Sequence, residues 1–278
     1  MWSEKIGFIG VGHMAGALLA IIQANDLCPP ERIYLSDIDS KKTMPYLAKR
    51  MNLAEIPDLI NQCSCVFLTV KPQDLSAVLE QSKPASAHKL FVSPVAGVTT
   101  RYIKERLHKD AHVLRVMPNT PIQIGKGATA IAMPDNLPSQ WVRMVQTLFS
   151  LGGEVAFIPE DKMDPIIGVN ASSPAYFFRM IKAIQEEAVR EGIQADVARR
   201  LAAKSMEGAA ALILSSEFSL DAMIAQVASP GGTTERSLQE MDALHFDKVI
   251  AMTLRACAQR AYELGMGSDA DRISNSKE

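Results

Sequence analysis

A run of glycines and hydroxyl residues, Ser229–Thr234 (Ser-Pro-Gly-Gly-Thr-Thr), interrupts a stretch that otherwise has the pattern of long apolar helices. Gly231 and Gly232 allow the backbone to curl, so that N–H groups at the start of the following helix are free to face a small carboxylate. The hydroxyl groups of Ser229 and Thr233 add further donors. The spacing alone fits a plain turn with N-capping threonines at least as well.

A second glycine-rich turn follows the first apolar segment of the chain. Gly10, Gly12 and Ala15 form a G-x-G-x-x-A pattern after the strand-like segment 5–9 and before the helical segment 13–25. The first glycine permits a tight turn, the second lets a pyrophosphate approach the backbone, and the small third residue lets the helix pack on the strand. This placement favours a dinucleotide-binding turn over a merely structural one.

The end of the second predicted strand bears on the choice of dinucleotide. Asp37 stands where an acidic side chain accepts the ribose 2′-OH of NAD. The carboxylate would repel the 2′-phosphate of NADPH, unless Ser36 and Lys41 or Lys42 bind that phosphate. Asp37 fits a helix N-cap equally well, so the choice between NADH and NADPH stays open.

Three loops at the ends of predicted strands are candidates for lining a ligand crevice. Ligands of open α/β sheets bind beyond the carboxyl ends of the strands, where such loops converge. The loops are Thr69–Asp74, Ser93–Gly97 and Val116–Pro121. Each is ordinary loop chemistry by itself, and their convergence is what indicates a site.

The elements that must position these residues change in type along the chain. In the first half, short apolar runs alternate with helical patterns, which predicts a parallel sheet with helices on both faces. From about Asp161 a helical periodicity takes over until Gly265, which we expect to end the last helix. We predict an α/β Rossmann-like, doubly wound parallel-sheet domain over residues 1–160, an all-α dimerisation domain over 161–265, and a disordered tail over 266–278.

Composition and charge argue against several classes of partner. The 29 basic and 31 acidic residues nearly cancel, so we expect no surface for nucleic acid or an anionic membrane. No apolar run reaches the roughly 18 residues that a membrane-spanning helix needs. The cysteines and histidines have no zinc or redox spacing, so we expect no metal site and a reduced, cytoplasmic protein.

Across most of its length the sequence resembles the pyrroline-5-carboxylate reductases, which reduce a cyclic imine to proline. The shared motifs run in consistent order from Lys5 to about Leu264: the glycine turn, Val-Lys-Pro, Ala-Gly-Val, Pro-Asn-Thr-Pro, Pro-Ala-Tyr and Ser-Pro-Gly-Gly-Thr-Thr. The last motif is the most specific, because few dinucleotide enzymes carry it. The resemblance implies a Rossmann domain, a helical domain that interlocks with a second subunit, and NADPH or NADH as the cofactor.

The resemblance also implies roles for individual residues. Thr234 matches the hydroxyl group that meets the ring nitrogen, and it is the candidate catalytic residue. Ser229, Gly232 and Thr233 match a cradle for the substrate carboxylate, and Glu160 matches an acidic residue near the domain junction. Together with Ser36 and Asp37, the candidates for cofactor binding are Gly10, Gly12, His13, Met14, Thr69, Val70, Lys71, Pro72, Ala96, Gly97 and Asn119, the last of which would frame the nicotinamide.

One segment departs from the family pattern. Asn170-Ala171-Ser172-Ser173 stands where the family usually reads Ser-Gly-Ser-Gly, and Ile167 stands where it usually has threonine. We expect the added side-chain atoms to make the substrate pocket narrower or more apolar than is typical.

We therefore expect an NAD(P)H-dependent reductase that converts the small molecule 1-pyrroline-5-carboxylate to L-proline, as a homodimer or a dimer-based oligomer. The first alternative is a related imine or β-hydroxyacid reductase of the same two-domain plan, although Lys182 and Lys204 lack the glycine-rich setting that carbonyl chemistry wants. The second alternative is a non-catalytic cofactor-binding regulator, which the altered segment 170–173 favours and the retained Thr234 disfavours.

Overall fold

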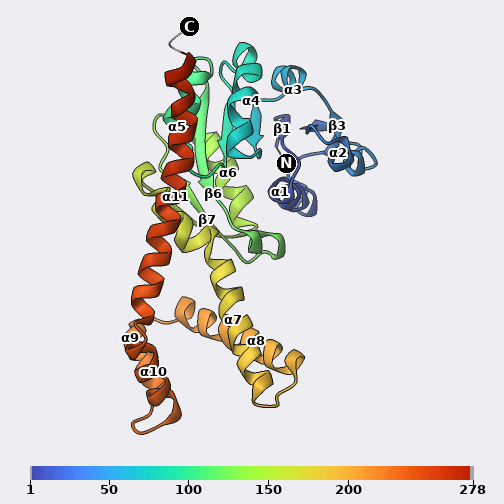
Figure 1. Ribbon diagram of the computed structural model, residues 1–278. Helices are drawn as coiled ribbons and strands as arrows, with labels where there is room; N and C mark the ends of the chain where they lie inside the picture. The colour runs from blue at the N-terminus through green and yellow to red at the C-terminus, as the bar shows by residue number, and fades with distance from the viewer. Residues whose placement is uncertain (1, 276–278) are drawn as a thin grey trace. The chain divides into compact units, whose positions relative to one another are not determined.

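The computed structural model describes residues 2–275, and its contacts divide the chain into two units. The sheet unit comprises the residues up to Ser172 together with those from Arg255 onward, and the helical unit comprises Ser173–Leu254 (Figure 1). These limits differ from the predicted boundaries at residues 160 and 265. The reason is that the segment after Glu160 and the second half of the last helix pack with the sheet.

Eight strands of the described chain form one sheet in the order β3-β2-β1-β4-β5-β6-β7-β8. They are β1 (Ile6–Ile9), β2 (Ile33–Ser36), β3 (Asn52–Leu53), β4 (Cys65–Leu68), β5 (Leu90–Ser93), β6 (His112–Met117), β7 (Gly127–Ala132) and β8 (Gly153–Ile158). Neighbouring strands pair in parallel except β6 and β7, which are antiparallel. The alternating sequence pattern predicts every strand except the two-residue β3. The chain order reverses between β1 and β4, and ligands of doubly wound sheets bind at such a switch point.

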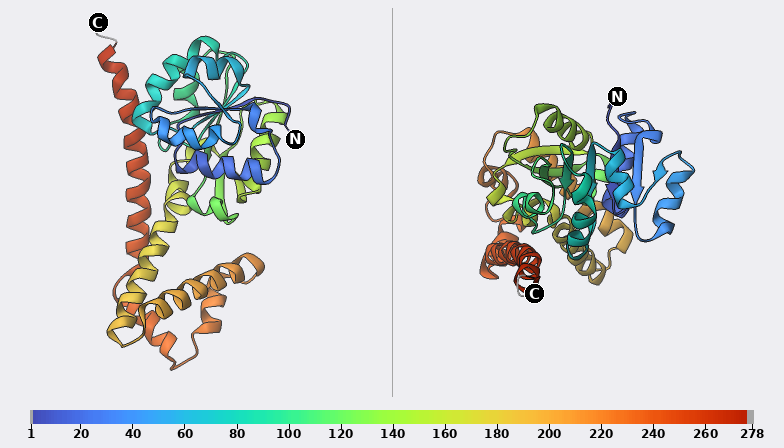
Figure 2. Two further views of the ribbon diagram at one scale, coloured as in Figure 1. Left: turned by 90° about the vertical axis from the view of Figure 1, so that its right-hand side faces the viewer. Right: turned by 90° about the horizontal axis from the view of Figure 1, so that it is seen from above.

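Helices cover both faces of this sheet (Figure 1 and Figure 2). One face packs against α1 (His13–Ala24) and α6 (Ser139–Ser150), and the other against α3 (Ile56–Gln62), α4 (Leu75–Ser82) and α5 (Thr100–Arg106). Successive strand residues alternate between the two layers, as the pleat of a strand requires: Phe8 belongs to the first core and Ile9 to the second. The short helix α2 (Ser40–Leu47) joins β2 to β3. This arrangement confirms the predicted doubly wound fold.

The segment after β8 remains part of the sheet unit up to Ser172. Residues Ile167–Ala171 form a π-helix, which is a rare element that often occurs at functional sites. Ile167 is buried in a small apolar cluster with Met117 and with Ala261 from α11 (Phe246–Asn275). Its burial makes Ile167 a core residue of the sheet unit.

The last helix, α11, continues past the glycine that was expected to end it, so the prediction of a helix stop at Gly265 is wrong. A Cβ built on Gly265 would lie 2.2 Å from the carbonyl oxygen of Gly97. Glycine at this position therefore permits a close contact between α11 and the loop after β5. The helix reaches Asn275, so residues 266–275 are helical where the sequence predicts disorder, and residues 276–278 of that predicted tail lie outside the described residues.

The helical unit has almost no core of its own. It contains α7 (Ser173–Arg190), α8 (Ala195–Ser215), α9 (Leu220–Val227), α10 (Thr233–Ala243) and the first residues of α11. α7 and α8 form its main internal contact. Among residues 173–254, only Ser173, Pro174 and Ala198 are buried. Most of the apolar side chains of this unit are therefore exposed in the single chain.

Candidate cofactor and substrate sites

The predicted phosphate turn joins β1 directly to α1. Gly10 has a φ of +89°, and a Cβ there would lie 2.7 Å from the carbonyl oxygen of Thr69, so glycine is required. Gly12 is the N-cap of α1, and a Cβ built on it would meet none of the described atoms within 4 Å. His13 and Met14 begin α1, whose first N–H groups have no acceptor within the helix and whose dipole attracts anions. The open space before a helix start fits a pyrophosphate.

Thr69 fixes this turn from the neighbouring strand. Its hydroxyl group donates a hydrogen bond to the carbonyl oxygen of Gly10 at 2.7 Å, and its N–H donates to the carbonyl oxygen of Ile9 at 2.9 Å. Thr69 thus lies where the sequence predicts. Its hydroxyl group, however, holds the glycine turn in shape.

Two cavities run along the carboxyl edge of the sheet and share Thr69 and Val70. The larger has a volume of about 450 Å³, and among its lining residues are Gly10, Gly12, Ser36, Asp37, Lys42, Ile56, Lys71 and Val78. The smaller has a volume of about 160 Å³ and is completed by Met14, Pro94 and Pro118. The loops after β1, β2, β4, β5 and β6 therefore meet at one crevice, as expected from the parallel strands. An elongated dinucleotide could lie across both cavities.

Asp37 follows β2 directly and is held by the backbone on two sides. Its Oδ2 accepts the N–H of Val11 at 2.7 Å, and its Oδ1 accepts the N–H of Asp39 at 2.8 Å. The side chain of Lys42 lies 3.4 Å from Oδ1. Burial alone would raise the pKa of Asp37, but these two N–H groups and the Lys42 ammonium outweigh it and lower the pKa below its usual value. The N-cap of α2 is Asp39, so the alternative interpretation of Asp37 as that N-cap is wrong.

Asn119 is buried, and its side-chain amide is bonded within the protein. Its Oδ1 accepts the N–H of Ala128 at 2.8 Å, and its Nδ2 donates to the carbonyl oxygen of Asn170 at 3.1 Å. The side chain of Asn170 in turn donates from its Nδ2 to the carbonyl oxygens of Met117 and Ala128 at 2.6 and 3.0 Å. We call this pair the asparagine clasp. It joins the π-helix to the end of β6 and so positions Pro118, which lines the smaller cavity.

Ala96 and Gly97 lie against α11. Gly97 has a φ of +78°, and a Cβ on it would lie 2.1 Å from the carbonyl oxygen of Ala261. Ala96 packs against the small cluster that contains Ala261. Neither residue lines the two cavities found along the sheet edge of the described chain, and their contact with a cofactor stays a prediction. The same holds for His13 and Pro72, which lies at the start of the turn Pro72–Asp74.

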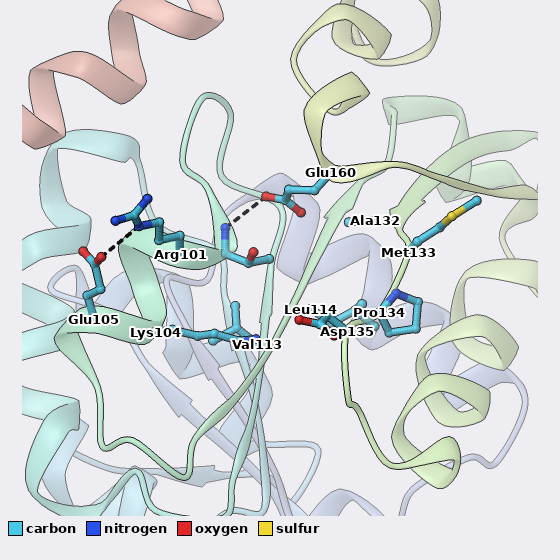
Figure 3. A pocket seen from close by; sticks show the side chains of 11 residues that line it. Arg101, Lys104, Glu105, Val113, Leu114, Ala132, Met133, Pro134, Asp135 and Glu160 are labelled. Carbon is cyan, nitrogen blue, oxygen red and sulfur yellow. Dashed lines mark hydrogen bonds and ion pairs between the residues drawn. The ribbon is translucent and has the colours of Figure 1, made fainter.

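Glu160 follows β8 and pairs with a buried arginine. Arg115 in β6 is 1% exposed, and its guanidinium lies 3.5 Å from Glu160 and is hydrogen-bonded to Asp164. The Oε1 of Glu160 also accepts the N–H of Thr100 at 3.0 Å. Figure 3 shows Glu160 beside a cavity of about 360 Å³ whose wall carries charges of both signs, including Arg101, Lys104, Glu105 and Asp135. The predicted substrate contact of Glu160 remains untested.

The Ser-Pro-Gly-Gly-Thr-Thr turn separates α9 from α10 in the helical unit, as predicted. Gly231 has a φ of +71°, and the N–H of Gly232 donates to the carbonyl oxygen of Ser229 at 2.9 Å. α10 begins at Thr233 with Gly232 as its N-cap, so the N–H groups of Thr233 and Thr234 lie in the first turn and have no acceptor within the helix. Thr233 is exposed and Thr234 is half-buried. The turn presents the free amides and hydroxyl groups that a small carboxylate requires.

Two residues near these sites were not predicted. Glu235 occupies the third position of α10, and its carboxylate accepts the N–H of Gly231 at 2.7 Å, which resembles a capping box. The sequence could have predicted this contact, because a glutamate three residues after an N-cap is the pattern of a capping box. The burial of Arg115 could also have been predicted, because a charged residue within the apolar run of β6 needs a buried partner of opposite charge.

Metal-binding clusters and membrane-spanning helices are both absent from the described part of the chain. Among residues 2–275, no group of histidine, cysteine, aspartate and glutamate side chains is arranged to hold a metal ion. Within the same range, each helix is too short or too polar to cross a bilayer.

Two family models match separate segments of the chain. The family described as "Pyrroline-5-carboxylate reductase dimerisation" matches residues 160–264, and the family described as "NADP oxidoreductase coenzyme F420-dependent" matches residues 5–97. The pyrroline-5-carboxylate reductase of Synechocystis is 34% identical over 266 residues, which is 95% of this chain and 99% of that relative. The chain belongs to the pyrroline-5-carboxylate reductase family. The family resemblance inferred from the motifs is thereby confirmed.

Solved structures of pyrroline-5-carboxylate reductases share the fold of this chain. The enzyme from Coxiella burnetii superposes with a TM-score of 0.85 at 28% identity, over 95% of this chain and 99% of its own. The pyrroline carboxylate reductase of Plasmodium falciparum, solved with NADP bound, superposes with a TM-score of 0.87 over 95% and 99% of the two chains. At 24% identity this second likeness shows the fold alone.

Proposed function

We propose that this protein reduces 1-pyrroline-5-carboxylate to L-proline with a nicotinamide dinucleotide as the hydride donor. The observation that carries the proposal is that one chain of this family has both a candidate cofactor site, in its sheet unit, and a candidate carboxylate site, in its helical unit. The sheet unit has an open phosphate turn beside two connected cavities. The helical unit has a helix start with free amides and hydroxyl groups. The names of the curated relatives support this substrate.

The residues of the sheet unit would hold the cofactor, which supplies the hydride when it is bound. Gly10, Gly12 and the start of α1 would bind the pyrophosphate, because a closely approaching anion needs a backbone without side chains there. The apolar wall that contains Ile56, Val70 and Val78 would take the adenine ring. Thr69 and the asparagine clasp would keep this crevice in shape.

The residues of the helical unit would bind and orient the substrate. The amides of Thr233 and Thr234, helped by the Ser229 hydroxyl group, would bind the carboxylate at the positive end of α10. The Thr234 hydroxyl group would bond to the ring nitrogen. That nitrogen becomes an amine as the imine carbon, which is carbon 5 of the proline product, accepts the hydride and the nitrogen keeps or gains a proton. A protonated cyclic imine is strongly electrophilic, so the reaction depends more on orientation than on a strong acid or base.

A turnover assay with Thr234→Ala tests this proposal. We expect the wild-type protein to oxidise NADH or NADPH only when pyrroline-5-carboxylate is present, with proline as the product. Loss of one hydrogen bond that strengthens along the reaction should lower kcat by about 10²–10³-fold, since such interactions contribute about 2.7–4 kcal/mol. Thr233→Ser keeps a hydroxyl group and should retain most activity. No turnover by the wild type with either cofactor would sink the proposed function, and full activity of Thr234→Ala would remove the role of Thr234.

We propose further that the enzyme works as a homodimer or a dimer-based oligomer in the cytoplasm. The exposed apolar side chains of the helical unit, including Phe178, Leu212 and Phe218, support burial against a second copy. The match to a family description named for dimerisation supports it as well. The cysteines Cys28, Cys63, Cys65 and Cys257 are free, which suits a reducing compartment.

A further inference from the structure

We propose that this enzyme selects NADH over NADPH and that Asp37 is the residue that makes the choice. The selectivity rests on the proposed function, because it concerns the cofactor of the same reaction. Asp37 lines the larger cavity together with Gly10, Gly12 and Ser36, so its carboxylate faces the space between the phosphate turn and the end of β2. In doubly wound folds the adenosine ribose lies in this space.

The position of the carboxylate is fixed before any ligand binds. The side chain of Asp37 is only 5% exposed, and it bridges two separate backbone segments. The N–H of Val11, which it accepts, belongs to the residue between the two glycines of the phosphate turn. Turning the carboxylate away from the ribose would leave this N–H and that of Asp39 without their acceptor. A bulky ligand group therefore cannot displace Asp37 at low cost.

The remaining bonding capacity of Asp37 matches a hydroxyl group. Among the described residues, Oδ1 accepts from Asp39 and Lys42, whereas Oδ2 accepts only from Val11. Because each carboxylate oxygen can accept two hydrogen bonds, Oδ2 keeps one acceptor position for a ligand. The ribose 2′-OH of NADH can donate to it. The 2′-phosphate of NADPH carries charge of the same sign as Asp37 and offers it almost only acceptors.

The charge state of Asp37 reinforces this discrimination. The pKa of Asp37 is lowered in spite of its burial, so the group is a carboxylate throughout the neutral range. Protonation would otherwise relieve the repulsion of a 2′-phosphate. Asp74 also lines the cavity and adds no compensating positive charge.

Lys42 is the side chain that could reverse the preference. It is 47% exposed and lies 3.4 Å from Asp37, so it could in principle turn toward a 2′-phosphate. Doing so would break its ion pair with Asp37 and leave the carboxylate beside the phosphate. The other lysine of the cavity, Lys71, follows β4. The carboxylate outweighs these ammonium groups, because two backbone N–H groups hold Asp37 in the site, whereas Lys42 would have to give up its ion pair to bind the phosphate.

Direct binding measurements test the selectivity without relying on turnover. NADH and NADPH are titrated into wild-type protein, and the Kd of each is read from the fluorescence of the nucleotide. We expect NADH to bind at least about tenfold more tightly than NADPH, which corresponds to about 1.4 kcal/mol. Asp37→Asn should cut this ratio by at least about fivefold, mainly by improving NADPH binding. The matched control is Asp39→Asn, which removes a charge from the same loop, keeps a good N-cap for α2, and should leave the ratio unchanged within about twofold.

The outcomes separate the selectivity from the proposed function. Equal or tighter binding of NADPH to the wild type would overturn the selectivity, whatever the variants do. In that case, selective loss of NADPH binding in Lys42→Ala would show that Lys42 binds the 2′-phosphate and so causes the tight binding of NADPH. If NADH binds preferentially but pyrroline-5-carboxylate is not reduced, the selectivity stands and the proposed function fails. If neither nucleotide binds, both are overturned.

Discussion

Arg115 is the largest fully buried side chain of the described chain, and it carries a charge. Its guanidinium reaches two carboxylates on the segment that follows β8, Glu160 and Asp164, while its Nε has no hydrogen-bond partner among the described residues. A buried charge is tolerated only when it is paired. At the residue scale, this ionic cluster is therefore one of the contacts that hold the segment after β8 to the sheet.

Removing one acid of this cluster should destabilise the sheet unit strongly. In Asp164→Ala, Arg115 would remain buried with only Glu160 at 3.5 Å, and we expect a loss of about 3 kcal/mol of unfolding free energy. Thermal unfolding measures this as a decrease of roughly 6–12 °C in the midpoint. Asp161→Ala is the control, because it removes an exposed carboxylate from the same segment and should leave the midpoint unchanged. Equal midpoints for the two variants would show that the cluster does not hold the segment.

Sequence reasoning predicted correctly the positions of residues whose surroundings are local, and their ligand contacts stay predictions. Gly10, Gly12 and Asp37 lie within or just after a single strand–turn–helix unit, so their spacing reveals them. The contact of Asn119 with the nicotinamide stays a prediction, whereas its bond to Asn170 could not be predicted, because Asn170 lies far along the chain. No spacing rule brings such partners together, and only the folded sheet does.

The π-helix Ile167–Ala171 is an element that the sequence pattern did not predict. A π-helix places Asn170 where its amide reaches β6 and β7 at once. The segment that departs from the family pattern is therefore an anchoring element of the sheet unit. Its added side-chain atoms were expected to narrow the substrate pocket, yet the amide of Asn170 is directed into the fold.

Breaking the asparagine clasp should loosen the wall of the smaller cavity. Asn170→Ala would leave the buried carbonyl oxygens of Met117 and Ala128 without this donor, at a cost of about 2 kcal/mol or more. We expect a lower unfolding midpoint and a raised KM for the cofactor. Ser172→Ala is the control, because the one side-chain contact of its hydroxyl group among the described residues is with the sulfur of Cys257 at 3.4 Å, and it should cost less than about 1 kcal/mol. A stable Asn170→Ala protein with an unchanged cofactor KM would contradict this role.

Regular elements were more predictable than their ends. The strands and helices of the sheet unit follow from alternating apolar runs, because burial on both faces leaves a strong pattern. The end of α11 does not follow from the sequence pattern, because Gly265 can either stop a helix or permit a close contact. Sequence cannot distinguish these two uses of a glycine when the contact partner, Gly97, lies on a distant loop.

At the scale of the whole molecule, the exposed apolar side chains of the helical unit favour association with a second copy of the chain. Its described residues bury almost nothing within the single chain, so the hydrophobic effect favours association with a second copy. We expect sedimentation to give at least twice the mass of one chain at micromolar concentration. Leu214→Glu, at a position 85% exposed in the chain, should weaken the assembly. Lys109→Glu, on the exposed surface of the sheet unit, is the control and should not. A monomeric wild-type protein would contradict the expected assembly.

The transfer of hydride from nicotinamide to the substrate is the most direct test of the account. The protein is incubated with pyrroline-5-carboxylate and NADH that carries two deuterium atoms at carbon 4, and the product is analysed by mass spectrometry. We predict proline that is one mass unit heavier, with the deuterium at carbon 5 and none released to water. Absence of proline, or proline without deuterium, would contradict the account.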